Sequence, residues 1–329
     1  MSFDRRNFMI GSAVIAGAAA LSSWVKPSLA GTDSMAVPKE SKQAPGYYRT
    51  KVGNITVTTI LDGAMQMPNE IFINATPEII KESRNRHFIP QDGPYPAYIN
   101  SFLIETGDKK ILIDTGAKNY IPTTGHTMGI LNMLGVSPLQ IDEIILTHAH
   151  PDHANGLLDD AGGIAFPKSV VKVCTPEVDF WFSDDQMAKF ADKKGLFDSA
   201  RTNLTPYKTS GQLQTYKPDA DLGNGLSSVA LPGHTPGHSG VMVSDGTAQL
   251  LIWGDIVHNA FLQFDYPEQS LSFDTDADAA RATRAKIFDR TATDRLRIAG
   301  MHLPMGAIGH LAKRGNGYDF VPQWWETNI

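Results

Sequence analysis

The stretch THAHPDHANGL, residues 147–157, places three histidines and one carboxylate within six positions, directly after an apolar run. Side chains two apart point to the same face of an extended segment, so His148 and His150 can present both imidazoles to one ion. Asp152 and His153 offer ligands for a second ion. Any one of these histidines alone would suit a solvated loop, but the complete spacing indicates a metal site. Imidazole and carboxylate suit two divalent ions, Zn first and Fe, Mn or Co as alternatives, with a position left for water.

Length and composition limit the class of protein. A chain of 329 residues with 42% hydrophobic content can bury a large core, and we expect one folded domain. The net charge is −6, and since residues 1–30 carry three basic side chains and one acidic, the remainder carries −8. An acidic body argues against nucleic acid as a partner. Cys174 is the one cysteine, so an intramolecular disulfide is excluded, and its apolar setting predicts a buried strand end.

Residues 1–30 have the features of an export signal. Arg5 and Arg6 precede a run of small apolar residues, and Ala30 ends a small-x-small cleavage pattern. The paired arginines resemble a twin-arginine signal, which implies the twin-arginine export machinery as a partner and a periplasmic or secreted location. An uncleaved anchor is the alternative, although the run is shorter than the roughly 20 residues of a spanning helix. Residues 31–45 predict a flexible arm, and 46–329 the folded domain.

The rest of the chain predicts two groups of strands with helices between and after them. Strands are expected at 54–61, 97–105, 110–114, 141–146, 170–174, 226–231, 239–243, 249–253 and, as the last strand, 297–300. Helices are expected at 76–86, 176–182 and 276–290. Asp62-Gly63 predicts a turn, residues 106–108 predict a hairpin, and 183–216 receives no assignment. The pattern indicates two sheets covered by helices.

The H-x-H-x-D-H spacing after a strand resembles the metal-binding signature of the metallo-β-lactamase superfamily. This resemblance implies an α/β fold, the metallo-β-lactamase αβ/βα sandwich of two mixed sheets flanked by helices. It also implies three later ligands, each after a predicted strand: His234, Asp255 and His302. One ion would be held by His148, His150 and His234, the other by Asp152, His153 and His302, with Asp255 shared.

Two further positions match the superfamily near these ligands. Asp114, in the segment ILIDTG, matches an aspartate that orients a ligand histidine, although an aspartate ending a hairpin strand would also explain it. His258 stands three residues after Asp255, where several related lactonases carry a tyrosine that contacts the substrate carbonyl. We therefore expect His258 to donate the same hydrogen bond.

Four further segments, 179–181, 195–197, 302–310 and 317–322, have sequences and spacings similar to those of methyl parathion hydrolase and its exported relatives. From about Pro45 onwards the chain is most similar to that family. In that family three aromatic side chains line the leaving-group pocket, and the matching positions are Tyr120, Trp181 and Phe197. Tyr120 departs from the usual phenylalanine and adds a hydroxyl. A second apolar wall is expected from Met65, Met67 and Phe72. Ordinary core packing would explain all six side chains equally well.

Together these residues predict a binuclear metal-dependent hydrolase of aryl esters, lactones or organophosphate triesters. Asp152, Asp255 and His258 are the expected catalytic residues, and a metal-bridging hydroxide is the expected nucleophile, because metal binding lowers the pKa of water to about 7. The alternatives are an acyl-homoserine lactonase, a glyoxalase II-like thioesterase, a mononuclear iron dioxygenase and a binding protein with a vestigial site. A class B β-lactamase of the commonest type is disfavoured, because it carries cysteine where Asp255 stands. The sequence leaves the substrate, the native metal and a homodimer open.

Overall fold

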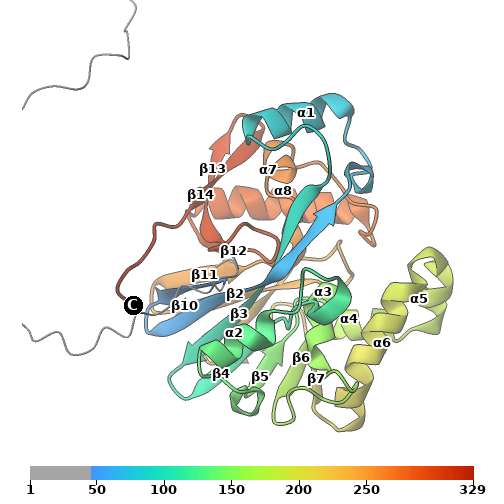
Figure 1. Cartoon of the computed structure of the whole chain (residues 1–329), viewed down its shortest axis with the longest axis vertical. Helices are drawn as coiled ribbons and strands as arrows, with labels where there is room; N and C mark the ends of the chain where they lie inside the picture. Colours follow the sequence, from blue (N-terminus) through green and yellow to red (C-terminus); the bar gives the residue numbers. More distant parts are fainter. Residues whose placement is uncertain (1–45) are drawn as a thin grey trace, which may run out of the picture. The chain divides into compact units, whose positions relative to one another are not determined.

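The computed structural model describes residues 46–329; the predicted export signal and arm lie outside the described residues. Two seven-stranded mixed sheets pack face to face with helices on their outer sides (Figure 1). The strand order is β1 to β7 in the first sheet and β14 to β8 in the second. The predicted αβ/βα sandwich is confirmed.

The first sheet changes from antiparallel to parallel pairing along its width. It contains β1 (Tyr47–Val52), β2 (Ile55–Met67), β3 (Tyr95–Thr106), β4 (Lys109–Ile113), β5 (Glu143–Ile145), β6 (Val170–Cys174) and β7 (Leu213–Tyr216). Pairing is antiparallel from β1 to β4 and parallel from β4 to β7. The β3–β4 hairpin forms at residues 106–108 as predicted, with Gly107 at a φ of +60°.

The second sheet is antiparallel apart from one parallel pair, β11 with β12. It contains β8 (Asp221–Gly223), β9 (Leu226–Ala230), β10 (Ser239–Asp245), β11 (Ala248–Ile252), β12 (Arg297–Ala299), β13 (Ile308–Arg314) and β14 (Gly317–Pro322). The prediction that residues 297–300 form the last strand is wrong, because the β13–β14 hairpin follows. Its apolar alternation is weak, because glycines and polar residues such as His310, Lys313 and Asp319 interrupt both strands.

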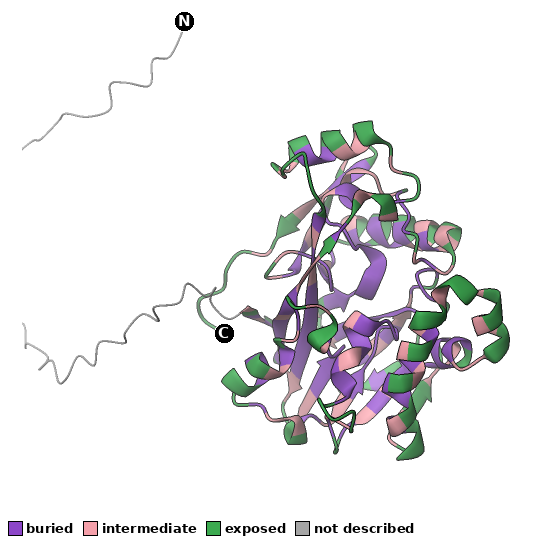
Figure 2. Cartoon of the chain, turned by 45° about the vertical axis from the view of Figure 1, so that its right-hand side comes forward, coloured by how far each residue is buried: buried purple, intermediate pink, exposed green. Residues whose placement is uncertain are grey.

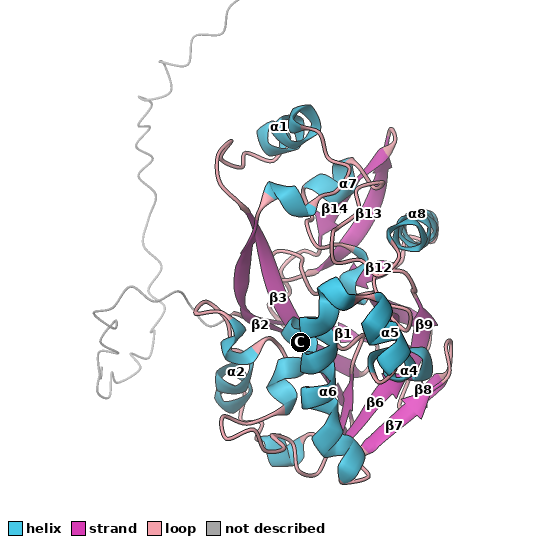
Figure 3. Ribbon diagram, turned by 90° about the vertical axis from the view of Figure 1, so that its right-hand side faces the viewer, coloured by secondary structure: helices cyan, strands magenta, loops and turns pink. Residues whose placement is uncertain are grey.

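The helices form two groups, one beside each sheet (Figure 3). One group, around β13 and β14, is α1 (Pro77–Arg86), α7 (Leu262–Asp265) and α8 (Ala277–Thr293). The other is α2 (Thr127–Met133), α3 (Pro151–Ala154), α4 (Thr175–Trp181), α5 (Asp184–Lys189) and α6 (Lys194–Thr209). The predicted helices correspond to α1, α4 and α8, whereas α5, α6 and β7 occupy the unassigned segment. Within residues 46–329 no helix combines the length and apolarity needed to cross a bilayer.

The Asp62-Gly63 pair lies inside strand β2, so the predicted turn is wrong. The pairing register shifts between Leu61 and Gly63, which makes Asp62 the extra residue of a bulge. Its buried carboxylate accepts hydrogen bonds from the backbone N–H groups of Ala117 and Gly125 and from the N–H and hydroxyl of Thr127. The bulge therefore fixes the loop between β4 and α2 instead of reversing the chain.

Two apolar layers hold the strands in place. The layer between the sheets contains Phe102 and Ile113 from the first sheet and Val241 and Ile252 from the second. The other layer packs α2, α4 and α6 on the outer face of the first sheet. Figure 2 shows the buried strands at the centre and the exposed helix faces outside. This packing fixes the strand ends, from which the site is built.

Candidate metal centre

Loops from both sheets converge at the carboxyl ends of their parallel strands. In the first sheet, β4 leads into Asp114 and β5 into the motif at 147–153. In the second, β11 leads into Asp255 and β12 into His302, while the β9–β10 loop carries His234. Neighbouring parallel strands end at the same edge of a sheet, so residues far apart in sequence meet here.

Three imidazoles form the first group of donor atoms. The Nδ1 atom of His150 lies 3.0 Å from Nε2 of His148 and 2.9 Å from Nε2 of His234. All three rings are buried. Burial, followed by the neighbouring imidazoles, lowers the pKa of His148 and of His150 well below the ordinary value. Neutral rings keep the lone pair that a metal ligand needs.

Asp255 lies between this group and a second one. Its Oδ2 atom is 3.6 Å from Nε2 of His148 and 3.5 Å from Nε2 of His234. On the other side it is 3.3 Å from Nε2 of His153 and 3.2 Å from Nε2 of His302. Burial alone would raise the pKa of Asp255, but the surrounding imidazoles outweigh it and hold the pKa well below its usual range. Asp255 therefore lies where one carboxylate fits between two groups of donor atoms.

Asp152 completes the second group. Its Oδ2 atom lies 3.4 Å from Nε2 of His153 and 3.5 Å from Nε2 of His302. The pKa of Asp152 is lowered as well, because attraction to the two rings exceeds the cost of burial. Nε2 of His153 and Oδ1 of Asp255 are buried without a hydrogen-bond partner, although both face the cluster. The donor set thus fits a dinuclear metal site, since bound cations would satisfy these atoms.

Asp114 orients one ring of the second group. Its Oδ2 atom lies 2.7 Å from Nδ1 of His153. The same carboxylate accepts hydrogen bonds from the backbone N–H and the hydroxyl of Thr147. Accepting from Nδ1 leaves the Nε2 atom of His153 free to face the cluster.

Two further contacts orient ligand rings, and the sequence did not reveal them. Oδ1 of Asp274 lies 2.8 Å from Nδ1 of His234, and the carbonyl of Tyr98 lies 2.6 Å from Nδ1 of His302. Asp274 is 40 residues from its partner. Because it lies in a loop without a motif, no local signal identified it.

The superfamily profile described as "Metallo-beta-lactamase superfamily" matches residues 94–302. The chain belongs to the metallo-beta-lactamase superfamily. It is similar to the crystal structure of hydrolase AbOPH in the beta lactamase superfamily, at 32% identity and a TM-score of 0.83, over 87% of this chain and 100% of that one. It is also similar to AidC, a dizinc quorum-quenching lactonase solved with a product, at 26% identity and a TM-score of 0.79, over 86% of this chain and 99% of that one.

Curated relatives match over a shorter region. The "Beta-lactamase-like protein 2 homolog" of Caenorhabditis elegans is 26% identical over 158 residues, which is 48% of this chain and 44% of the relative. The homolog of Drosophila melanogaster is 28% identical over 162 residues, covering 48% and 46%. The match therefore spans less than half the length of these relatives.

In this metallo-beta-lactamase-fold chain, His258 faces the carboxylate of Asp255. Its Nε2 atom lies 3.1 Å from Oδ2 of Asp255, and its ring stacks on that of His302 with centroids 5.2 Å apart. Burial lowers the pKa of His258 to about 4, so the ring is neutral at pH 7. The predicted contact of His258 with a substrate carbonyl stays a prediction.

The three aromatic residues predicted to form one pocket differ in their exposure. Trp181 and Phe197 have 0% exposed surface, whereas Tyr120 is 58% exposed. Trp181 packs edge-on against His150 at 5.5 Å and against Phe197 at 4.7 Å. Helices α4 and α6 place these two rings in the outer apolar layer, and the predicted leaving-group pocket stays a prediction. Tyr120 instead lies on a short 3-10 turn, Lys118–Tyr120.

The predicted apolar wall also packs inward. Met67 and Phe72 are buried in a third apolar cluster, and Met65 packs against it half-buried. Phe273 belongs to the same cluster and contacts two rings of the site, those of His234 at 6.0 Å and His258 at 5.3 Å. Phe273 is thus the member that reaches the metal centre, and no sequence signal identified it.

A surface cavity of about 580 Å³ adjoins the ligand motif at residues 147–157. Its lining includes Tyr120, Pro151, Lys193, Leu196 and Phe273. Pro151 belongs to the ligand motif, and Phe273 contacts His258, so the cavity leads toward the metal centre. It is large enough to hold a small organic substrate.

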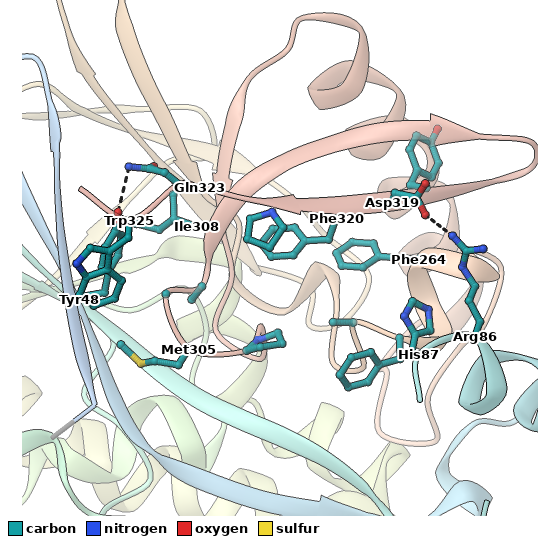
Figure 4. Close-up of a pocket in the computed structure, with 17 residues that line it drawn as sticks. Tyr48, Arg86, His87, Phe264, Met305, Ile308, Asp319, Phe320, Gln323 and Trp325 are labelled. Atoms are coloured by element: carbon teal, nitrogen blue, oxygen red, sulfur yellow. Dashed lines mark hydrogen bonds and ion pairs between the residues drawn. The ribbon is translucent and has the colours of Figure 1, made fainter. Parts of the chain in front are cut away.

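A separate cavity of about 640 Å³ contains none of the predicted ligands (Figure 4). Aromatic side chains, including Tyr48, Phe264 and Trp325, line it. At one end Arg86 forms an ion pair with Asp319 at 2.6 Å. The candidate site is therefore at the metal centre and not in this cavity.

Proposed function

We propose that this chain is a dinuclear metal-dependent hydrolase of carboxylic esters, with lactones and aryl esters as its substrates. The observation that carries the proposal is the position of Asp255, whose Oδ2 atom lies 3.2 Å to 3.6 Å from four predicted ligand rings of the two groups. Similarity to a dizinc lactonase supports zinc and the lactone class.

The two groups would divide the ions between them. His148, His150 and His234 would hold one ion, Asp152, His153 and His302 the other, and Asp255 would contact both. Two bound divalent ions supply Lewis acidity toward a carbonyl oxygen and lower the pKa of water to about 7. Asp114 and Asp274 keep the ligand rings in the orientation that this requires.

Other side chains would act on the organic substrate. His258 is neutral at pH 7, and its Nε2 lies beside Asp255. An N–H at this atom would turn from the carboxylate to a substrate carbonyl oxygen bound next to it. Phe273 and Leu196 give the cavity an apolar wall for an aryl or acyl group. Tyr120 places a hydroxyl at the cavity, which favours polar lactone and ester groups over the apolar aryl group of a phosphotriester.

A substrate panel tests the proposal. Purified protein loaded with zinc should hydrolyse aryl esters and lactones faster than nitrophenyl phosphotriesters, and should bind about two ions per chain. The test variant is Asp255→Asn. It keeps the shape of the side chain but loses the negative charge of the proposed shared ligand, so kcat/KM should fall more than about 100-fold. One tightly bound ion, full activity of Asp255→Asn, or activity restricted to phosphotriesters would contradict the proposal.

The second candidate is an acyl-homoserine lactonase. It is favoured by the similarity to AidC, whose complex contains an N-acyl homoserine product. A clear preference for long-chain acyl-homoserine lactones over aryl esters in the same panel would support this candidate. Ion counting separates both hydrolases from a mononuclear dioxygenase.

A further inference from the structure

Glu177 lies in the first turn of α4 and is completely buried. One carboxylate oxygen, Oε1, accepts hydrogen bonds from the backbone N–H of Ala149 at 3.0 Å and from the indole N–H of Trp181 at 2.6 Å. The other, Oε2, accepts from the hydroxyl of Thr235 at 2.6 Å and the backbone N–H of Gly237 at 3.0 Å. Both oxygens are therefore fully used by the protein itself.

Three of the four donors belong to two ligand loops that come from different sheets, and the fourth, Trp181, lies on α4 itself. Ala149 stands between His148 and His150 in the loop after β5, and Thr235 follows His234 in the loop after β9. The Nδ1 atom of His150 and the Nε2 atom of His234 are 2.9 Å apart. One side chain thus connects the backbones that carry the ligands of a single ion.

The packing around Glu177 leaves little room for the loops to shift. A Cβ atom on Gly237 would lie 2.2 Å from the backbone nitrogen of Glu177, so this position has space only for glycine. Trp181 covers the carboxylate on α4 and packs edge-on against His150. Helix α4 therefore packs closely against both ligand loops, the one after β5 and the one after β9.

We propose that Glu177 is a positioning residue for the first metal position, because it fixes the separation of His150 and His234. This inference rests on the proposed metal-dependent function. Glu177 does not bind substrate directly, because its side chain is completely buried. In this proposal Trp181 stabilises the position of Glu177 by donating a hydrogen bond to its carboxylate.

A carboxylate suits this position better than an amide. Three of the four donors are N–H groups, which cannot turn around to accept a hydrogen bond. Glutamine has the same shape, but its amide nitrogen must face at least one of these N–H groups. Glu177→Gln should therefore break at least one bond and loosen one loop relative to the other.

The test measures zinc affinity at each metal position separately. In a His302→Ala background the first position remains, and adding Glu177→Gln should weaken its zinc affinity about 10-fold to 100-fold in a chelator competition. In a His234→Ala background the second position remains, and the same addition should change zinc affinity less than about threefold. A purely structural role of Glu177 would weaken both positions equally.

Asp62→Asn is the matched control, because Asp62 is equally buried and also accepts four hydrogen bonds, but from the loop at 117–127. It should lower the melting temperature without a selective effect on the first position. If Glu177→Gln does not fold, Thr235→Val removes one donor and should weaken the first position several-fold. Unchanged affinity in the variant that folds would overturn this inference alone, whereas a wild-type protein without tight zinc binding would overturn the proposed function as well.

Discussion

At the scale of single residues, burial and hydrogen bonding set the protonation states of the metal centre. Buried histidines lose the solvation that favours the charged ring, so His148, His150 and His258 have lowered pKa values. His153 has a raised pKa despite burial, since the carboxylates of Asp255, Asp152 and Asp114 surround it. The first group of rings is thus neutral, whereas His153 holds a proton beside the carboxylates. A divalent cation bound at the second group would displace this proton and take its place beside the negative charge.

His258 provides a test of transition-state stabilisation beside these ligands. If its N–H donates to the developing oxyanion, His258→Ala should lower kcat about 10²-fold to 10³-fold, as the loss of one preorganised donor does elsewhere. Zinc content, measured by atomic emission, should stay at the wild-type value. A variant with normal kcat would refute the donor role, and one that has lost an ion would make His258 a metal ligand instead.

His238 predicts a pH dependence of stability. Its Nδ1 atom contacts the carbonyl of Leu231 and its Nε2 atom accepts the backbone N–H of Asp255, so the folded state requires a neutral ring. Burial lowers its pKa to about 3 from an ordinary value of 6.5. Between these values the unfolded chain binds more protons, and the free energy of unfolding therefore falls as the pH decreases from 6.5 toward 3.

His238→Gln removes this titration while retaining a donor and an acceptor. Between pH 7 and pH 5 the wild type should lose about 2 kcal/mol more unfolding free energy than the variant, in denaturant titrations of both proteins. Other buried histidines titrate in both proteins and cancel in the comparison. Parallel pH profiles of the two proteins would show that His238 is not held neutral.

At the scale of elements, helices α4 and α6 set which aromatic side chains are buried beside the metal centre. Their packing on the first sheet places Trp181 and Phe197 in the outer apolar layer. The bulge at Asp62 fixes the loop that exposes Tyr120. As a result, the cavity wall next to the metal centre is supplied by Phe273 and Leu196 and by the exposed Tyr120.

Trp181→Ala should accordingly behave as a core substitution. Truncating a completely buried tryptophan should cost about 3 to 5 kcal/mol of unfolding free energy, which denaturant titration can measure. Aryl and alkyl esters should then lose kcat/KM by the same factor, since the indole has no surface in the cavity. Trp181→Phe, which keeps a ring but loses the N–H, is the control. A decrease of kcat/KM for aryl esters alone would instead indicate that Trp181 lines the leaving-group pocket.

At the scale of the whole molecule, the metal centre joins two sheets that each hold only part of it. His148, His150, Asp152 and His153 come from the first sheet and His234, Asp255 and His302 from the second. Neither sheet alone carries a complete set of ligands for one ion. We therefore expect the ions to bind tightly only after the sandwich has formed, so that zinc stabilises the folded chain.

Export is a prediction of the sequence that lies outside the described residues. Replacing both Arg5 and Arg6 with lysine should retain the protein in the cytoplasm of a bacterium that has the twin-arginine machinery. The wild type should yield a periplasmic form that starts near Gly31, detected by fractionation and N-terminal mass. Unchanged export of the lysine variant would indicate the general secretory route, and an intact N-terminus would indicate an anchor.

The sequence by itself determined the fold class and the chemical type of the site. The ligand motif at 147–153 and the apolar strands before it are local patterns, which depend on residue spacing and can be read without the fold. The N-cap of α1 at Thr76 and the β3–β4 hairpin are local for the same reason. These features depend on residues a few positions apart, whose geometry the backbone fixes.

Only the tertiary structure decided which distant side chains support and surround the metal centre. Asp274 contacts His234, which is 40 residues away in the sequence, and Glu177 accepts a hydrogen bond from Ala149, which is 28 residues away. The burial of Trp181 and the bulge at Asp62 likewise depend on how helices and loops pack on the first sheet. Such contacts produce no periodic pattern in the sequence. The sequence therefore does not predict which partner a buried carboxylate or aromatic ring will contact.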